Sequence, residues 1–294
     1  MGILLGLATA LGWGCSDFLA RFSTRRIGTL RTTLYMQGIG FLLLTGLLAA
    51  TGRWGHLADG SGWQPWAWGA LAGAINCFAT LTLYRSFEVG RMSVVAPISA
   101  SYPALTLLLA VATGERLTAA RAIGIGLTLL GAILVASGEE SSSGGAENLK
   151  SAARPGKRKG VLFAVLAASG FGLLFWLLGT RIITSVGPWA TVWMIRLTSM
   201  LVLTVALQGT RQKMGLPGGA VRWQLLGMGV LDTSAFVLNN RGMEIEQVSV
   251  VSVLSSLYGA VTVALAAIIL KERPARKQWA GIFFIFCGIF LIVR

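Results

Sequence analysis

Three charged side chains lie inside long apolar segments of the sequence, where an ionised group is costly unless it is paired or reaches water. These residues are Asp17, Arg196 and Asp232. Arg196 and Asp232 fall near the middle of two successive apolar segments, so they could form a buried pair. Such a pair would either hold two helices together or anchor a substrate carboxylate or a coupling ion.

Asp17 and Asp232 are the two carboxylates that could couple transport to protons. Asp17 lies about one helical turn from the expected end of its apolar segment, so its carboxylate either reaches water or takes part in transport. A carboxylate inside a membrane is a candidate for proton transfer because it can take up and release a proton.

A set of polar and aromatic residues in the apolar segments could line a substrate pathway. Tyr102 and Tyr258 are the main candidates, because a tyrosine hydroxyl in the middle of a span needs a hydrogen-bond partner. Hydrogen bonding between helices is the alternative role for the polar members of the set. The predicted pathway residues are Trp13, Asn76, Tyr84, Ser99, Tyr102, Phe171, Trp176, Arg196, Asp232, Asn239, Ser256 and Tyr258.

Residues suited to metal binding or acid–base catalysis are scarce. Cys15, Cys77 and Cys287 lie in apolar segments without metal-site or disulfide spacing, and the single histidine, His56, lies in a loop. The sequence contains no Walker motif and no selectivity-filter sequence. We therefore expect no metal, no cofactor and no enzymatic activity; a membrane-embedded enzyme and a channel remain the alternatives from other classes.

The composition places these residues in a membrane. Of the 294 residues, 54% are hydrophobic and only 12% are charged, and the mean hydropathy is +0.71. Soluble domains carry roughly 25% charged residues. The net charge of +14 comes from short basic clusters between apolar runs, which are typical of membrane-protein loops. We expect the lipid bilayer to be a partner and expect no binding to nucleic acid.

Ten apolar segments are long enough to cross a bilayer, which takes about 17–25 residues. Because backbone polar groups cannot stay unpaired in lipid, each is predicted to be helical, and the fold class is an all-α integral membrane protein. The first segment lacks the basic region and cleavage site of a signal peptide, so it should remain as a helix. The predicted spans are residues 3–20, 33–51, 66–84, 93–113, 119–137, 161–180, 189–207, 223–240, 249–270 and 276–293.

The chain divides into two halves of five spans, residues 1–137 and 161–294, joined by a linker at 138–160. The linker is rich in small, polar and basic residues that cannot bury a core, so it is predicted to be mobile. Since each half has an odd number of spans, the second half must enter the membrane from the opposite side. An inverted repeat of this kind is typical of secondary transporters that work by alternating access.

The two halves are also similar in sequence. Residues 93–110 and 249–266 are identical at nine of eighteen positions. This similarity includes polar residues and extends into the flanking segments, which chance resemblance between leucine-rich helices does not explain. The matched pairs include Ser99–Ser255, Tyr102–Tyr258, Thr106–Thr262, Arg85–Arg241, Glu88–Glu244 and, more weakly, Trp13–Phe171.

Lys and Arg are unevenly distributed between the two sets of loops. Counted together with the first residues of the span that follows, the loops after odd-numbered spans hold 18 of the 25 basic residues, and the loops after even-numbered spans hold 5. Cytoplasmic loops collect Lys and Arg. The linker 138–160 is therefore predicted to be cytoplasmic, and both termini are predicted to lie outside.

Glycines recur every seven residues in the fifth and tenth spans, at Gly124, Gly131 and Gly138 and at Gly281 and Gly288. Small residues in register let membrane helices approach closely. This spacing predicts tight contact with other helices or self-association, so the protein could be a monomer or a homodimer.

Two long runs resemble the paired repeats of a known family. They are SVVAPISASYPALTLLLAVATGERLTAARAIGIGLTLLGAILV, from Ser93, and SVVSVLSSLYGAVTVALAAIILKERPARKQWAGIFFIFCGIFLIV, from Ser249. Each places a Glu-Arg pair between two helices, and together they resemble the drug/metabolite transporter superfamily, EamA type, over essentially the whole chain. The resemblance implies ten helices, a cavity lined mainly by spans 1–4 and 6–9, and peripheral spans 5 and 10.

Two features depart from that family. Pro97 and Pro103 are replaced by Val253 and Gly259 in the second half, so a proline hinge would be one-sided. Comparable members usually keep both termini in the cytoplasm, opposite to the orientation that the charge count predicts.

The function predicted from these features is secondary transport of a small organic solute by alternating access. The resemblance implies export of amino acids, aromatic ones included, or of related metabolites, across the plasma membrane of a bacterium, with protons as a possible coupling ion. A drug or nucleotide-sugar carrier of the same fold is the alternative within this class.

Overall fold

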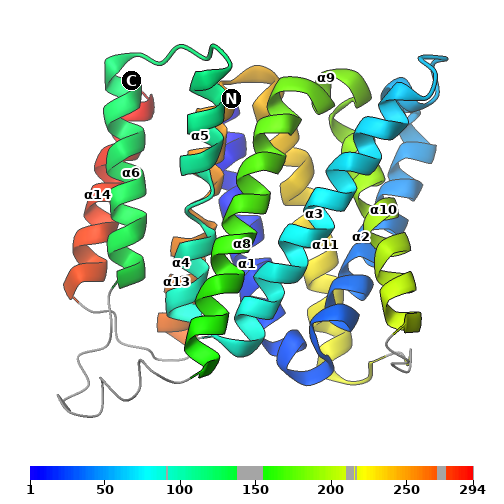
Figure 1. The fold of residues 1–294 in the computed structure, drawn as a ribbon, viewed down its shortest axis with the longest axis horizontal. Helices are drawn as coiled ribbons and strands as arrows, with labels where there is room; N and C mark the ends of the chain where they lie inside the picture. Colours follow the sequence, from blue (N-terminus) through cyan, green and yellow to red (C-terminus); the bar gives the residue numbers. More distant parts are fainter. Residues whose placement is uncertain (91, 138–154, 210–214, 216, 270–275, 294) are drawn as a thin grey trace.

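The computed structural model of the protein describes residues 1–90, 92–137, 155–209, 215, 217–269 and 276–293 (Figure 1). Every regular element among these residues is helical. The first half contains α1 (Gly2–Ile27), α2 (Thr29–Thr51), the short 3₁₀ helix η1 (Gly55–Leu57), α3 (Gln64–Val89), α4 (Met92–Ser99), α5 (Pro103–Ala112) and α6 (Ala119–Ser137). The second half contains α8 (Pro155–Leu177), the π-helical turn η2 (Leu178–Ile182), α9 (Ile183–Val186), α10 (Pro188–Gly209), α11 (Ala220–Ile245), α12 (Val248–Ser255), α13 (Tyr258–Ile269) and α14 (Arg276–Val293).

Several sequence predictions fall on residues outside this description. They are Gly138, most of the linker, and the Glu272–Arg273 pair of the second half. Within the predicted linker, residues 155–160 are already helical and form the first turns of α8.

Six of the described helical stretches are long and apolar enough to cross a membrane: Gly2–Ile27, Thr29–Thr51, Gln64–Val89, Lys159–Val186, Pro188–Gly209 and Val248–Ile269. Shorter apolar stretches occur in α5, α6 and α14. The expectation of an all-α membrane protein is therefore confirmed for the described residues.

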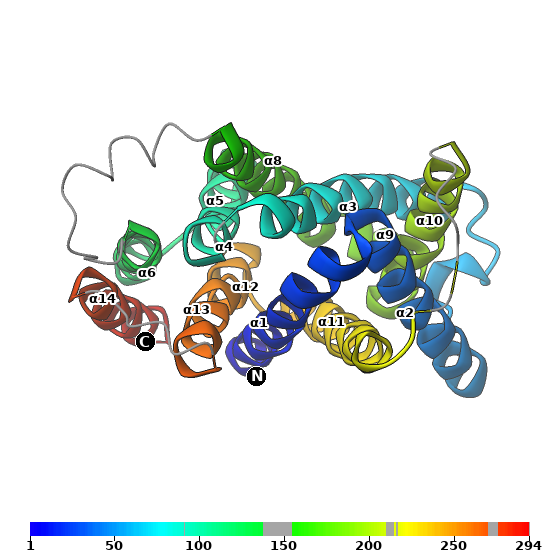
Figure 2. The same ribbon diagram turned by 90° about the horizontal axis from the view of Figure 1, so that it is seen from below.

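The two halves pack against each other through equivalent helices. α1 of the first half lies along α11 of the second, and α3 of the first half lies along α8 of the second. Because α1 corresponds to α8 and α3 to α11 in the repeat, these are the same contact made twice. α6 and α14 pair with each other at one edge of the molecule, where α6 also contacts α4, α12 and α13 (Figure 2). α1 begins and α14 ends at the same end of the molecule (Figure 1).

Two predicted spans are interrupted. The span predicted at 93–113 is split into α4 and α5 by residues 100–102, and the span predicted at 249–270 is split into α12 and α13 by residues 256–257. Pro103 explains the first break, because proline lacks an N–H and begins α5. In the second break, the Ser255 and Ser256 hydroxyls donate to the carbonyls of Ser252 and Val253, a local bonding that competes with the regular helix.

The breaks occur at equivalent positions of the repeat, although only the first is followed directly by a proline. In membrane transporters, discontinuous helices of this kind commonly lie beside the substrate site. The two breaks therefore indicate where a substrate cavity should be sought.

Candidate functional site

A cavity lies where the two halves meet, between α1 and α3 of the first half and α8 and α11 of the second. Tyr102 and Tyr258, at the two helix breaks, complete its wall. It contains about 420 Å³ of space not filled by atoms, its open mouth included. The lining side chains are Trp13, Asp17, Asn76, Thr80, Leu83, Tyr84, Tyr102, Phe171, Phe175, Asp232, Phe236 and Tyr258.

Asp17 is a buried wall residue of this cavity, with 5% of its surface exposed. The sequence placed it near the end of its helix, and this placement is wrong, because α1 continues ten residues further, to Ile27. The Asp17 carboxylate makes no hydrogen bond or ion pair with any residue that the structure describes. Asp232 is close enough to repel it electrostatically.

Asp232, in contrast, is paired. Its Oδ2 accepts a hydrogen bond from Arg196 Nη2 at 2.6 Å, and Arg196 Nη1 donates to Gln37 Oε1 at 2.6 Å. The guanidinium also lies over the Phe236 ring, 5.5 Å from its centroid. Arg196 is only 1% exposed and does not line the cavity. The buried pair is therefore present, and Arg196 is held by protein groups from α2 and α11.

Aromatic rings form much of the remaining wall. The Trp13 ring lies 5.5 Å from those of Phe175 and Phe236 and 6.3 Å from that of Tyr258, measured between centroids. Tyr102 contacts Phe175 at 4.8 Å and is stacked on Tyr258 at 6.4 Å. The rings come from both halves and buttress one another, so they provide a rigid apolar surface.

Asn76 adds a polar group without a partner. It is 1% exposed, and neither its Nδ2 nor its Oδ1 makes a hydrogen bond with any described residue. A buried amide without partners is unusual, because leaving it unsatisfied costs free energy. Its place in the cavity wall makes it available to a bound molecule or to water.

A model of the EamA-like transporter family matches residues 1–137 and 158–294, one match for each half. This chain belongs to the EamA-like transporter family. The predicted resemblance to the drug/metabolite transporter superfamily is therefore confirmed, and the chain is a multi-pass membrane transporter.

Solved structures agree on the fold. One protein crystal structure is 18% identical to the chain, with a TM-score of 0.75 over 99% of this chain and 95% of the other. At that identity the likeness concerns the fold alone. A comparison with curated proteins finds no match.

Some residues predicted for the pathway of this EamA-like transporter do not reach the cavity wall. Ser99 is buried and donates to the carbonyls of Val95 and Ala96 in its own helix. Trp176 lies on another face of α8, where its indole N–H donates to Thr113 Oγ1 at 3.2 Å. Asn239 and Ser256 are buried with bonds inside their own segments, Asn239 Nδ2 to Met243 Sδ and Ser256 Oγ to the Val253 carbonyl.

Four wall residues were not predicted, namely Thr80, Leu83, Phe175 and Phe236. Three of them follow a predicted residue by four positions: Thr80 after Asn76, Phe175 after Phe171 and Phe236 after Asp232. Residues four apart share a helix face, so helical spacing from the predicted residues could have identified these three.

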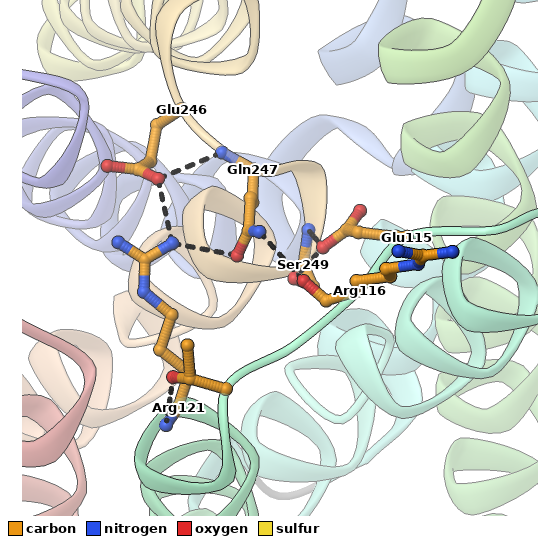
Figure 3. A network of polar contacts seen from close by, with 7 residues as sticks. Glu115, Arg116, Arg121, Glu246, Gln247 and Ser249 are labelled. Carbon is orange, nitrogen blue, oxygen red and sulfur yellow. Dashed lines mark hydrogen bonds and ion pairs between the residues drawn. The ribbon is translucent and has the colours of Figure 1, made fainter.

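A second polar cluster of the transporter joins the two halves (Figure 3). It lies at the end of the molecule where α1 begins, because Gly2 packs against Glu246. Arg121 Nη1, from α6, donates to Glu246 Oε1 at 3.1 Å and to Gln247 Oε1 at 2.7 Å. Gln247 Nε2 donates to the Arg116 carbonyl at 3.0 Å, and the Ser249 hydroxyl donates to Glu115. These contacts hold the α5–α6 loop against the start of α12.

Proposed function

We propose that this EamA-like transporter is a secondary carrier that exports small organic solutes, in particular amino acids, aromatic ones included, or related metabolites. The observation that carries the proposal is the cavity between the halves, with aromatic rings and polar groups drawn from both repeats and from both helix breaks. Binding sites of transporters with inverted repeats lie at this kind of interface. Aromatic rings suit an aromatic or apolar substrate body.

The proposal includes the place and energy source of transport. The carrier would lie in the inner membrane of a bacterium with residues 138–160 in the cytoplasm, because most Lys and Arg lie in loops on that side. Asp17 and Asp232 are the carboxylates through which protons could couple to transport, since both line the cavity.

Counterflow into liposomes tests the function. Purified protein is reconstituted, loaded with unlabelled amino acid and exposed to labelled amino acid, with and without a pH gradient. We expect saturable uptake that internal substrate accelerates, which a channel does not show. Absence of exchange for every amino acid, from folded protein, would contradict the substrate proposal and direct the assay to drugs and nucleotide sugars.

A further inference from the structure

The charges around the cavity balance only while Asp17 is protonated. Asp17 and Asp232 can each carry a negative charge, and Arg196 supplies one positive charge, which is already paired with Asp232 at 2.6 Å. Asp17 is 5% exposed and has no counter-ion among the described residues. A buried carboxylate without a partner is costly. It therefore favours any ligand that brings a positive charge.

None of the described side chains that line the cavity is cationic, so an anion finds no opposite charge in its wall. Arg196 is the nearest cation, but it is 1% exposed, lies behind the wall, and its two terminal nitrogens are bonded to Gln37 and Asp232. A substrate carboxylate would have to displace Gln37 or Asp232 to bond to these two nitrogens. Recognition of a substrate by its carboxylate, which the sequence left open for Arg196, is therefore not what this geometry supports.

The aromatic wall suits an organic cation. The negative faces of aromatic rings attract ammonium groups, and several rings together form a cage for them. Trp13, Phe236 and Tyr258 surround the same space as Asp17. An inorganic cation would instead need several oxygen ligands, and no group of three or more His, Cys, Asp or Glu residues occurs among the described residues.

Asn76 supplies an independent indication that the cavity accepts a ligand. Its amide is 1% exposed, faces the cavity and has no hydrogen-bond partner among the described residues. An amide oxygen accepts hydrogen bonds from an ammonium group. Asn76 and Asp17 come from α3 and α1, so they could hold one amino group from two directions.

We propose that the cavity binds the protonated amino group of an aromatic or apolar amine, with Asp17 as its counter-ion and Asn76 as a further acceptor, and that a substrate carboxylate is not required. This inference rests on the proposed carrier function and specifies its substrate class. Amino acids would be recognised by their amino group, and amines without a carboxylate would bind at least as well.

A series of three ligands with one phenyl body tests the inference. Equilibrium dialysis of the purified full-length protein in detergent would compare phenethylamine, phenylalanine and 3-phenylpropionate. We expect phenethylamine to bind at least as tightly as phenylalanine, and 3-phenylpropionate to bind at least about tenfold more weakly. Binding of 3-phenylpropionate as tight as that of the amine, or no binding of the amine, would overturn the proposal.

Replacing the carboxylate of Asp17 by an amide provides the second measurement. Asp17→Asn keeps the side chain's shape and removes its charge, so phenethylamine binding should weaken by about tenfold or more. Asp59→Asn, which alters an exposed loop carboxylate, is the matched control and should leave binding unchanged. Equal affinities in wild type and a folded Asp17→Asn variant would refute the role of Asp17; should that variant not fold, the ligand series decides alone.

Binding measurements test the amine site, and counterflow measurements test the carrier function on which this inference rests. Phenethylamine binding without any counterflow would support the amine site and contradict the carrier function. Phenylalanine counterflow without phenethylamine binding would support the carrier and contradict the amine site.

Discussion

The Tyr102 hydroxyl lies 2.7 Å from the Ser255 hydroxyl, and the two residues belong to opposite halves of the chain. The equivalent pair in the repeat is Tyr258 with Ser99. Ser99 lies beside Tyr258, but its hydroxyl donates to the carbonyls of Val95 and Ala96 in its own helix, and the Tyr258 hydroxyl has no hydrogen-bond partner by distance and angle among the described residues. The two halves therefore differ at matched positions, which is what a carrier with inverted repeats requires, because its halves exchange conformations between states.

This asymmetry predicts different effects of the same substitution at the two tyrosines. Tyr102→Phe removes the bonds to Ser255 Oγ and to the Ser252 carbonyl, so it should lower the free energy of unfolding by about 1–2 kcal/mol. Tyr258→Phe removes a buried hydroxyl that makes no bond, so it should leave the free energy of unfolding unchanged or raise it. Denaturant unfolding in detergent measures both, and equal losses would show that the bonding is symmetric.

The buried pair of Arg196 and Asp232 predicts a strong stability effect. Arg196→Met leaves the Asp232 carboxylate without its donor, and this should cost about 3–5 kcal/mol. Arg196→Met combined with Asp232→Leu removes both charges and should be less destabilising than the single change. The readout is the unfolding midpoint in detergent. A double variant less stable than Arg196→Met would contradict the assignment of a charge pair.

The polar contacts of Arg121 predict a gate that controls access to the cavity from the side where α1 begins. Arg121→Gln loses the ion pair with Glu246, and a loss of about 1 kcal/mol from the closed state would raise the open population about fivefold. The measurement is labelling of a cysteine introduced at cavity residue Thr80, with the native cysteines replaced by alanine. A membrane-impermeant thiol reagent is added on the side where α1 begins.

The control for this gate is Arg241→Gln, which breaks an exposed pair with Glu244 inside α11. It should leave the labelling rate unchanged, because that pair does not join the two halves. Equal labelling of the two variants would mean that the Arg121 contacts do not close the cavity.

The contact between α6 and α14 predicts that one glycine cannot be replaced by alanine without a loss of stability. A Cβ atom at Gly288 would lie 2.5 Å from the Gly124 carbonyl oxygen, so Gly288→Ala should cost about 1–3 kcal/mol by overpacking. A Cβ atom at Gly126 would meet nothing within 4 Å, and Gly126→Ala should be neutral or slightly stabilising. Thermal unfolding of both variants in detergent tests this, and a similar loss in both would refute it.

Helix ends and helix faces account for most differences between the sequence-based expectations and the structure. Asp17 was expected near the end of its helix because the first span was predicted to end at residue 20, yet α1 extends to Ile27 and buries Ser23 and Thr24 in its last turns. The break at residues 256–257 was not expected, because serines rather than a proline produce it. The close contact that the spacing of Gly281 and Gly288 predicts is present at Gly288, which packs against Gly124 and Thr128.

The sequence by itself determined the membrane as solvent, the all-α class, the division into two repeats and the family. These depend on composition, on the length of apolar runs and on matched residues, which are properties of short stretches of chain. Only the tertiary structure decided which buried charge has a partner. Arg196 is bonded to Asp232 of its own half and to Gln37 of the first half. Asp17 has no bonding partner among the described residues. Such partnerships depend on the rotation and depth of each helix, which are set by packing between halves and cannot be read from spacing along one helix.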